Sequence, residues 1–118
     1  MGKKAPGREG EDKAALYLEE RGMSIIVRNF RSRTGEIDII ALHGNILVFA
    51  EVKNWKLHGF EQLEYSINDQ KQRRIIETAK FFLNSHREYK EMIIRFDVIF
   101  IGKDGAITHL ASAFSERV

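Results

Sequence analysis

An apolar stretch of strand type, Ile46-Leu47-Val48-Phe49-Ala50-Glu51-Val52-Lys53, ends in a carboxylate and an amine two residues apart. Both faces of this stretch are apolar through Ala50, which predicts a central strand that is covered on both sides. Because side chains alternate across a strand, Glu51 and Lys53 are expected on the same face. The stretch therefore predicts a layered α/β protein with two charged groups at the end of its central strand.

The segment just upstream contains Gly35-Glu36-Ile37-Asp38 and predicts a neighbouring strand over residues 36–42. Three residues, His43-Gly44-Asn45, separate the two strands, and such a short connection with a glycine is typical of a β-hairpin. Hairpin pairing would bring Asp38 beside Glu51. Aspartate is uncommon inside strands, so Asp38 is expected at the exposed beginning of its strand or beside a partner.

The rest of the chain predicts the element order α-β-β-β-α-β-β. A mixed central sheet of about five strands with helices on its faces buries such a pattern. We expect a flexible basic arm over residues 1–8 and a single domain over residues 9–118. The expected elements are a helix over 9–21, a strand over 25–30, a polar turn over 31–35, strands over 36–42 and 46–53, a long connection over 54–65, a helix capped by Ser66 or Asn68 and reaching about 85, and strands over 92–101 and 106–110.

Length and composition fit one ordinary globular domain. The chain has 118 residues, of which 43% are hydrophobic and 31% are charged. The absence of cysteine excludes a disulfide framework and thiolate metal sites, and it fits a reducing compartment. No apolar run approaches the ~20 residues that a membrane span needs, and the N-terminus lacks the apolar core of a signal peptide. We therefore expect a cytoplasmic protein with no membrane partner.

Basic residues gather locally although the net charge is only +2. Arg28, Arg31 and Arg33 precede Glu36, and a second group begins at Lys71. Such local groups would attract a polyanion, whereas each residue taken alone favours a solvated surface charge.

The charged residues near the hairpin have two interpretations. Glu51 and Lys53 alone favour a simple ion pair on one strand face. With Asp38 on the adjacent strand, the two carboxylates and an ammonium form an unfavourable cluster unless a cation joins them. Magnesium prefers such oxygen ligands.

Glu11 is a further candidate from the first helix. It falls on the same helical face as Ala14, Ala15 and Leu18, which is expected to dock on the sheet. Glu9 competes for this position. The alternative is that Glu11 only stabilises the positive end of the helix dipole.

Several linked motifs occur in order along nearly the whole chain. They are Gly7-Arg8-Glu9-Gly10-Glu11, Arg28-Asn29-Phe30-Arg31, Gly35-Glu36-Ile37-Asp38-Ile39-Ile40-Ala41, Phe49-Ala50-Glu51-Val52-Lys53, Lys71-Gln72 and Arg95-Phe96-Asp97-Val98. This set resembles the UPF0102 family of small bacterial proteins, also called the YraN family. The resemblance implies a restriction-endonuclease-like fold, similar to archaeal Holliday junction resolvases and with the PD-(D/E)xK signature.

The resemblance also implies roles for individual residues. Asp38 and Glu51 would bind Mg²⁺ or Mn²⁺, and Lys53 would lie beside the attacked phosphate. Glu11 would be an accessory acid. The chain departs from the family pattern at Trp55, where a basic residue is common and for which Lys56 could substitute, and at Ile37, which takes the place of the signature's proline.

These roles combine into a hypothesis for the function. Asp38, Glu51 and the backbone carbonyl of Val52 would hold the metal of an endonuclease that cuts DNA, with branched or structured DNA as a candidate substrate. Such a small enzyme usually needs two active sites, which favours a homodimer. The expected contacts to backbone phosphates are Arg28, Arg31, Arg33, Lys56, Lys71 and Gln72.

Two other function classes remain open from the sequence. One is a nucleic-acid-binding module that keeps the nuclease fold without catalysis. The other is a purely structural α/β domain in which Glu51 and Lys53 form a salt bridge. Asp97 is expected to anchor structure, and the histidines show no ligand-like spacing.

Overall fold

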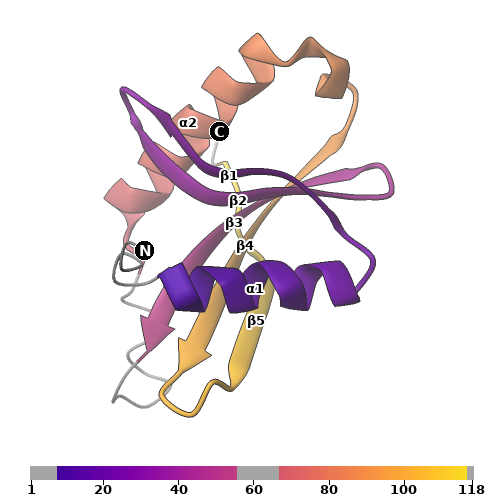
Figure 1. The fold of residues 1–118 in the computed structure, drawn as a ribbon. Helices are drawn as coiled ribbons and strands as arrows, with labels where there is room; N and C mark the ends of the chain where they lie inside the picture. The colour runs from indigo at the N-terminus through magenta and orange to yellow at the C-terminus, as the bar shows by residue number, and fades with distance from the viewer. Residues whose placement is uncertain (1–7, 56–66, 117–118) are drawn as a thin grey trace, which may run out of the picture.

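Five strands form one mixed sheet in the computed structural model, which describes residues 8–55 and 67–116 (Figure 1). The strands lie in the order β1-β2-β3-β4-β5; β3 and β4 are parallel, and the other neighbours are antiparallel. This architecture confirms the predicted α/β class and the order α-β-β-β-α-β-β. The elements are α1 (Arg8–Glu20), β1 (Ser24–Ser32), β2 (Gly35–His43), β3 (Ile46–Trp55), α2 (Asp69–Ser85), the 3₁₀ turn η2 (Arg87–Tyr89), β4 (Ile93–Gly102) and β5 (Ile107–Phe114).

Strand pairing extends the strands beyond the sequence estimates. β1 and β2 stay paired as far as Ser32 and Gly35, so the turn expected over 31–35 shrinks to two residues. β3 continues to Trp55 because its last residues pair in parallel with β4. β5 likewise reaches Phe114. Partners on adjacent strands thus keep polar residues in extended backbone that their own propensities do not favour.

The two helices cover opposite faces of the sheet. α2 packs on a core rich in aromatic side chains, where the Phe49 ring lies 5.9 Å from that of Phe82. α1 packs Ala14 and Leu18 against a second, aliphatic core that includes Val48. β3 therefore contributes to both cores and is buried on both sides, as the sequence predicted for a central strand.

The start of α2 is fixed by a capping hydrogen bond. The Asn68 side chain accepts a hydrogen bond from the Lys71 backbone N–H at 2.9 Å. Asn68 is thus the N-cap that the sequence left open, and the alternative Ser66 lies outside the described residues. In the described part of the chain, neither helix is both long and apolar enough to cross a bilayer.

The sheet divides between β2 and β3 at one end. Pairing of these strands stops at Ile39 and Ala50, whereas β2 continues along β1 and β3 continues along β4 (Figure 1). In β1, Asn29 has a left-handed backbone with φ 56°. On one side of it Arg28 faces α1, and on the other Phe30 packs on Phe82 of α2 at 5.2 Å between ring centroids. The resulting fork brings together side chains from α1, β1, β2, β3 and α2.

Candidate metal centre

Asp38 and Glu51 meet at the fork, one residue beyond the last paired residues of β2 and β3. The Val52 backbone N–H donates a hydrogen bond of 2.7 Å to Asp38 Oδ2. The aspartate side chain thus takes the place of a strand carbonyl where the strands separate. The hairpin register predicted from the sequence brings these two carboxyl groups together.

The proximity of the two carboxyl groups changes their protonation. Burial, followed by the neighbouring Glu51, raises the pKa of Asp38 to about 8, although the Val52 N–H acts in the opposite direction. At neutral pH the pair therefore holds a proton, because two adjacent carboxylates in a half-buried site repel each other. A divalent cation would remove the same repulsion.

Two lysines face Glu51, and the nearer one comes from α2. Lys71 Nζ lies 2.7 Å from Glu51 Oε2, whereas Lys53 Nζ lies 3.9 Å away. Burial and the nearby Lys71 ammonium lower the pKa of Lys53. Burial also opposes the charge of Lys71, but the Glu51 carboxylate outweighs it and raises the pKa of Lys71. Lys71 was predicted as a phosphate contact, and the structure places it on Glu51.

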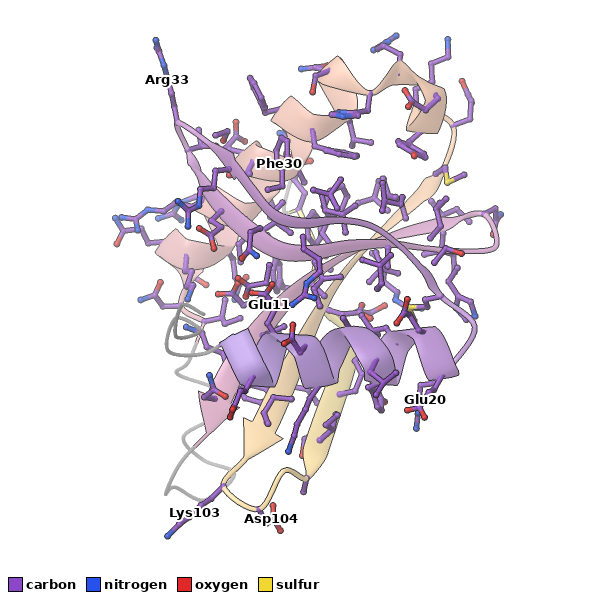
Figure 2. All side chains as sticks on the ribbon, viewed as in Figure 1. Glu11, Glu20, Phe30, Arg33, Lys103 and Asp104 are labelled. Carbon is purple, nitrogen blue, oxygen red and sulfur yellow. The ribbon has the colours of Figure 1, made fainter. Side chains whose placement is uncertain are left out.

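Glu11 projects from the first turn of α1 toward the strands (Figure 2). Its carboxylate accepts hydrogen bonds from Asn29 Nδ2 at 2.9 Å and Arg28 Nε at 3.2 Å, and its side chain is 12% exposed. Its charge contributes to the raised pKa of Asp38. Glu9, the competing candidate, is exposed, so the structure favours Glu11 as the helix residue that faces the fork.

The basic residues of the β1–β2 hairpin do not form one surface at the fork. Arg28 binds Asp12 Oδ1 at 2.6 Å as well as Glu11, and Arg31 Nε binds Glu36 at 2.7 Å. Arg33 projects from the hairpin tip, away from α1 (Figure 2). The Arg31 side chain is itself 75% exposed, so both arginines near this tip face solvent.

Three further predicted positions need separate mention. The Gln72 side-chain amide donates a hydrogen bond of 3.1 Å to the Ile67 carbonyl near the start of α2. Lys56 and the side chain of Trp55 lie outside the described residues. The Val52 carbonyl belongs to β3, which pairs with β4 at this position, and its role as a metal ligand stays a prediction.

The donor set suits a hard cation that keeps part of its water shell. Within residues 8–55 and 67–116, no three Asp, Glu or His side chains are already arranged as metal ligands. Magnesium commonly uses only one or two carboxylates and completes its octahedron with water and substrate phosphate. The Asp38 and Glu51 carboxylates, together with the Val52 backbone carbonyl, therefore fit such an ion. Glu11 would act on the surroundings of the ion and not as a direct ligand.

Asp97 forms a second polar cluster on the side of the sheet that α1 covers. Arg95 donates two hydrogen bonds of 2.9 Å to its carboxylate, His109 Nε2 lies 2.7 Å away, and the Ser112 N–H donates at 3.1 Å. The hydroxyl group of Tyr17 in α1 extends this hydrogen-bonded cluster, since it lies 3.1 Å from His109 Nδ1. The sequence left His109 unassigned, because its contact with Asp97 depends on the β4–β5 pairing, in which His109 lies opposite Ile99.

Sequence reasoning also missed the part played by Asn29. The signal was present, since asparagine is one of few residues that tolerate a left-handed backbone. Its side chain holds Glu11 in place, and its backbone turns Arg28 toward α1.

Comparison with known proteins identifies relatives over almost the full chain. Residues 10–101 match the model of the uncharacterised protein family UPF0102. A UPF0102 protein of Treponema pallidum strain Nichols is 47% identical over 118 aligned residues, covering 95% of this chain and 94% of that protein. A UPF0102 protein of Persephonella marina is 46% identical over 108 residues, covering 92% and 91%. One of Coxiella burnetii is 37% identical over 107 residues, covering 91% and 89%. The chain therefore belongs to the UPF0102 family.

Proposed function

We propose that this protein is a divalent-metal-dependent endonuclease that hydrolyses phosphodiester bonds in DNA. The observation that carries the proposal is the Asp38–Glu51 pair, in which burial, followed by the neighbouring Glu51 carboxyl group, raises the pKa of Asp38 to about 8. A charged cluster at the open end of a sheet is unfavourable for folding, so its presence supports a ligand that balances it. The restriction-endonuclease-like relationship and the PD-(D/E)xK signature are part of this proposal.

The side chains divide the work of hydrolysis between them. Asp38 and Glu51, with the Val52 carbonyl, would hold Mg²⁺ or Mn²⁺. When bound, such an ion supplies charge stabilisation and lowers the pKa of a coordinated water. Lys53 lies on the Glu51 face and, at 30% exposure, can still reach solvent, so it can orient the water or neutralise charge developing on the phosphoryl oxygens.

Glu11 has an indirect part in this proposal. Asn29 and Arg28 hold its carboxylate by hydrogen bonds, and its negative charge acts on the Asp38–Glu51 pair. It would accept hydrogen bonds from water near the metal. The exposed Arg33 and the pair of Arg31 with Glu36 lie on the β1–β2 hairpin, where phosphate contacts would position DNA without reading its sequence.

The test is cleavage of DNA by the purified protein in Mg²⁺ and Mn²⁺. Branched, duplex and single-stranded DNA and an RNA of equal length should be compared for the wild type, Asp38→Ala and Lys53→Ala. Lys103→Ala is the matched control, because Lys103 is an exposed lysine on the distant β4–β5 turn (Figure 2). We expect metal-dependent cutting of DNA by the wild type and Lys103→Ala only. Cutting that survives Asp38→Ala or Lys53→Ala would contradict the site.

A nucleic-acid-binding module without catalysis is the second candidate. The observation in its favour is the close ion pair between Glu51 and Lys71, which already neutralises one of the two carboxylates. This candidate predicts that Asp38→Asn and Lys53→Ala leave DNA affinity nearly unchanged. It also predicts that no metal produces cleavage of any substrate.

Assembly and location complete the proposal. A homodimer would present two sites to the two strands of a duplex or junction. Sedimentation of the purified protein measures this directly, and a monomer at all concentrations would contradict it. We include a cytoplasmic location in the proposal, because a DNA substrate would be met there.

A further inference from the structure

The nearest cation to Glu51 comes from α2 and not from its own strand. Lys71 Nζ is 2.7 Å from Glu51 Oε2, and Lys53 Nζ is 3.9 Å from the same oxygen. The Glu51 side chain is only 10% exposed, whereas the Lys71 side chain is 35% exposed. One end of this ion pair is therefore buried, and the other end keeps a route to solvent.

Local structure fixes the Lys71 backbone at this place. Its N–H donates to the Asn68 cap at 2.9 Å, and it is the third residue of α2. A lysine in the first turn of a helix is electrostatically unfavourable, because the helix N-terminus already carries positive partial charge. The contact with Glu51 offsets this cost.

We propose that Lys71 is an internal counter-ion of Glu51 that a divalent cation displaces, so that metal binding releases its ammonium to contact a substrate phosphate. This inference rests on the proposed metal site and adds a coupling between metal binding and nucleic-acid binding. An ammonium at 2.7 Å and a divalent ion on the same carboxylate oxygen repel each other and compete for the same lone pairs. Lysine has a flexible four-carbon stem, so the displaced ammonium can turn outward while α2 stays in place.

Thermodynamic linkage follows from this competition. If the metal frees Lys71 for a phosphate, metal and nucleic acid each strengthen the binding of the other by the same factor. Without metal, Lys71 stays on Glu51 and contributes little to DNA affinity. The ion pair would thus keep the site closed to DNA until the ion has bound.

The experiment measures Mn²⁺ affinity by titration calorimetry on the full chain without nucleic acid. Lys71→Met removes the ammonium and keeps the length of the side chain. Lys80→Met is the matched control on the same helix, since Lys80 pairs with Glu77 and Glu116 away from the fork. We expect Lys71→Met to bind Mn²⁺ roughly 5- to 150-fold more tightly than the wild type, and Lys80→Met to match the wild type. Unchanged or weaker Mn²⁺ binding by folded Lys71→Met overturns the inference.

A second measurement tests the coupling to nucleic acid. The affinity for a short DNA duplex is measured with and without Ca²⁺, which also takes oxygen ligands. The wild type and Lys80→Met should bind DNA more tightly with Ca²⁺, and Lys71→Met should lose most of this gain. Retention of the full gain by Lys71→Met overturns the coupling.

The two proposals fail in different ways. Metal-dependent cleavage together with unaltered Mn²⁺ affinity in Lys71→Met leaves the nuclease proposal standing and removes the role of Lys71. Tighter Mn²⁺ binding by Lys71→Met without cleavage of any DNA or RNA supports the counter-ion and removes the nuclease. Absence of Mn²⁺ binding by both proteins overturns both.

Discussion

Asp38 and Asp97 are two aspartates in one sheet with opposite surroundings. Asp97 is fully buried, yet Arg95, His109 and the Ser112 N–H satisfy both of its oxygens. Asp38 receives one backbone N–H and faces the carboxyl group of Glu51. Burial raises the pKa of Asp97, but His109 and Arg95 outweigh it and lower the pKa. Among the described residues no arginine or histidine ion pair balances Asp38, and burial together with Glu51 raises its pKa to about 8.

The difference distinguishes a structural carboxylate from one that, in our proposal, binds a metal. The Asp97 cluster ties β5 and α1 to β4 at a bulge, where a strand hydrogen bond is replaced by the side chain. The Asp38 pair lies where the sheet opens, and in our proposal a divalent cation would offset its electrostatic cost. Burial alone does not distinguish the two aspartates, whereas the charge of their partners does.

Cleavage should separate the two aspartates most strongly. Asp38→Asn should lower the cleavage rate by about 1,000-fold or more, since metal stabilisation of the transition state is worth several kcal/mol. Asp97→Asn should keep the rate within about tenfold per folded molecule. Rates are measured in Mn²⁺ below the melting temperature of each variant, with the folded fraction taken from circular dichroism. Equal losses in both variants would remove the distinction.

Stability should show the reverse order. Asp97→Asn leaves Arg95 and His109 without their anion and should reduce the free energy of unfolding by about 2–3 kcal/mol. Asp38→Asn removes the repulsion with Glu51 and should stabilise the metal-free protein by about 1–2 kcal/mol at pH 8. Urea unfolding in a chelator measures both. A destabilised Asp38→Asn would show that this carboxylate is structural after all.

The sequence predicts the Asp38 pair better than it predicts the Asp97 cluster. Alternating apolar residues and a short glycine turn define the hairpin, and the register then places Asp38 against Glu51. The Asp97 cluster depends on a bulge and on the left-handed Ser112, with φ 53°, which no local pattern indicates.

Contacts that depend on helix placement are harder to predict. Lys71 reaches Glu51 only because α2 docks on the sheet after a long connection, and many helix positions fit the same pattern. From the sequence alone, Arg28 is a free basic residue. In the structure, Asn29 turns the backbone so that the Arg28 side chain contacts Asp12 and Glu11. Strand register is therefore encoded locally, and long-range ion pairs are set by tertiary packing.

The two aspartates should give opposite pH dependences in the metal-free protein. Folded Asp38 keeps its proton to about pH 8, whereas the unfolded chain releases it near the ordinary value of 3.8. The folded state binds more protons over this interval, so its stability falls as pH rises from about 4 to about 8. The lowered pKa of Asp97 has the opposite sign: its contribution is present above 3.8 and is lost as pH falls through the folded value.

Urea titrations across pH in a chelator check these slopes. Asp38→Asn should flatten the decline toward pH 8 and leave the acid limb unchanged, and Asp97→Asn should do the converse. If Asp38→Asn leaves the decline intact, another group holds the proton. Saturating Mn²⁺ should also flatten the decline in the wild type, because the ion takes the place of the proton.

We expect the smallest effect at Asn29, whose side chain holds Glu11 near the Asp38–Glu51 pair. Asn29→Gly keeps the left-handed backbone at φ 56° but removes the hydrogen bond to Glu11, so it should cost about 1 kcal/mol of stability. Asn29→Ala loses the same bond and adds a methyl group that disfavours this backbone, for a total of about 2 kcal/mol. The difference between the two variants in urea unfolding isolates the backbone term. Equal losses would mean that the Glu11 contact alone matters, and that the turn of β1 toward α1 is held by Arg28 and its acidic partners.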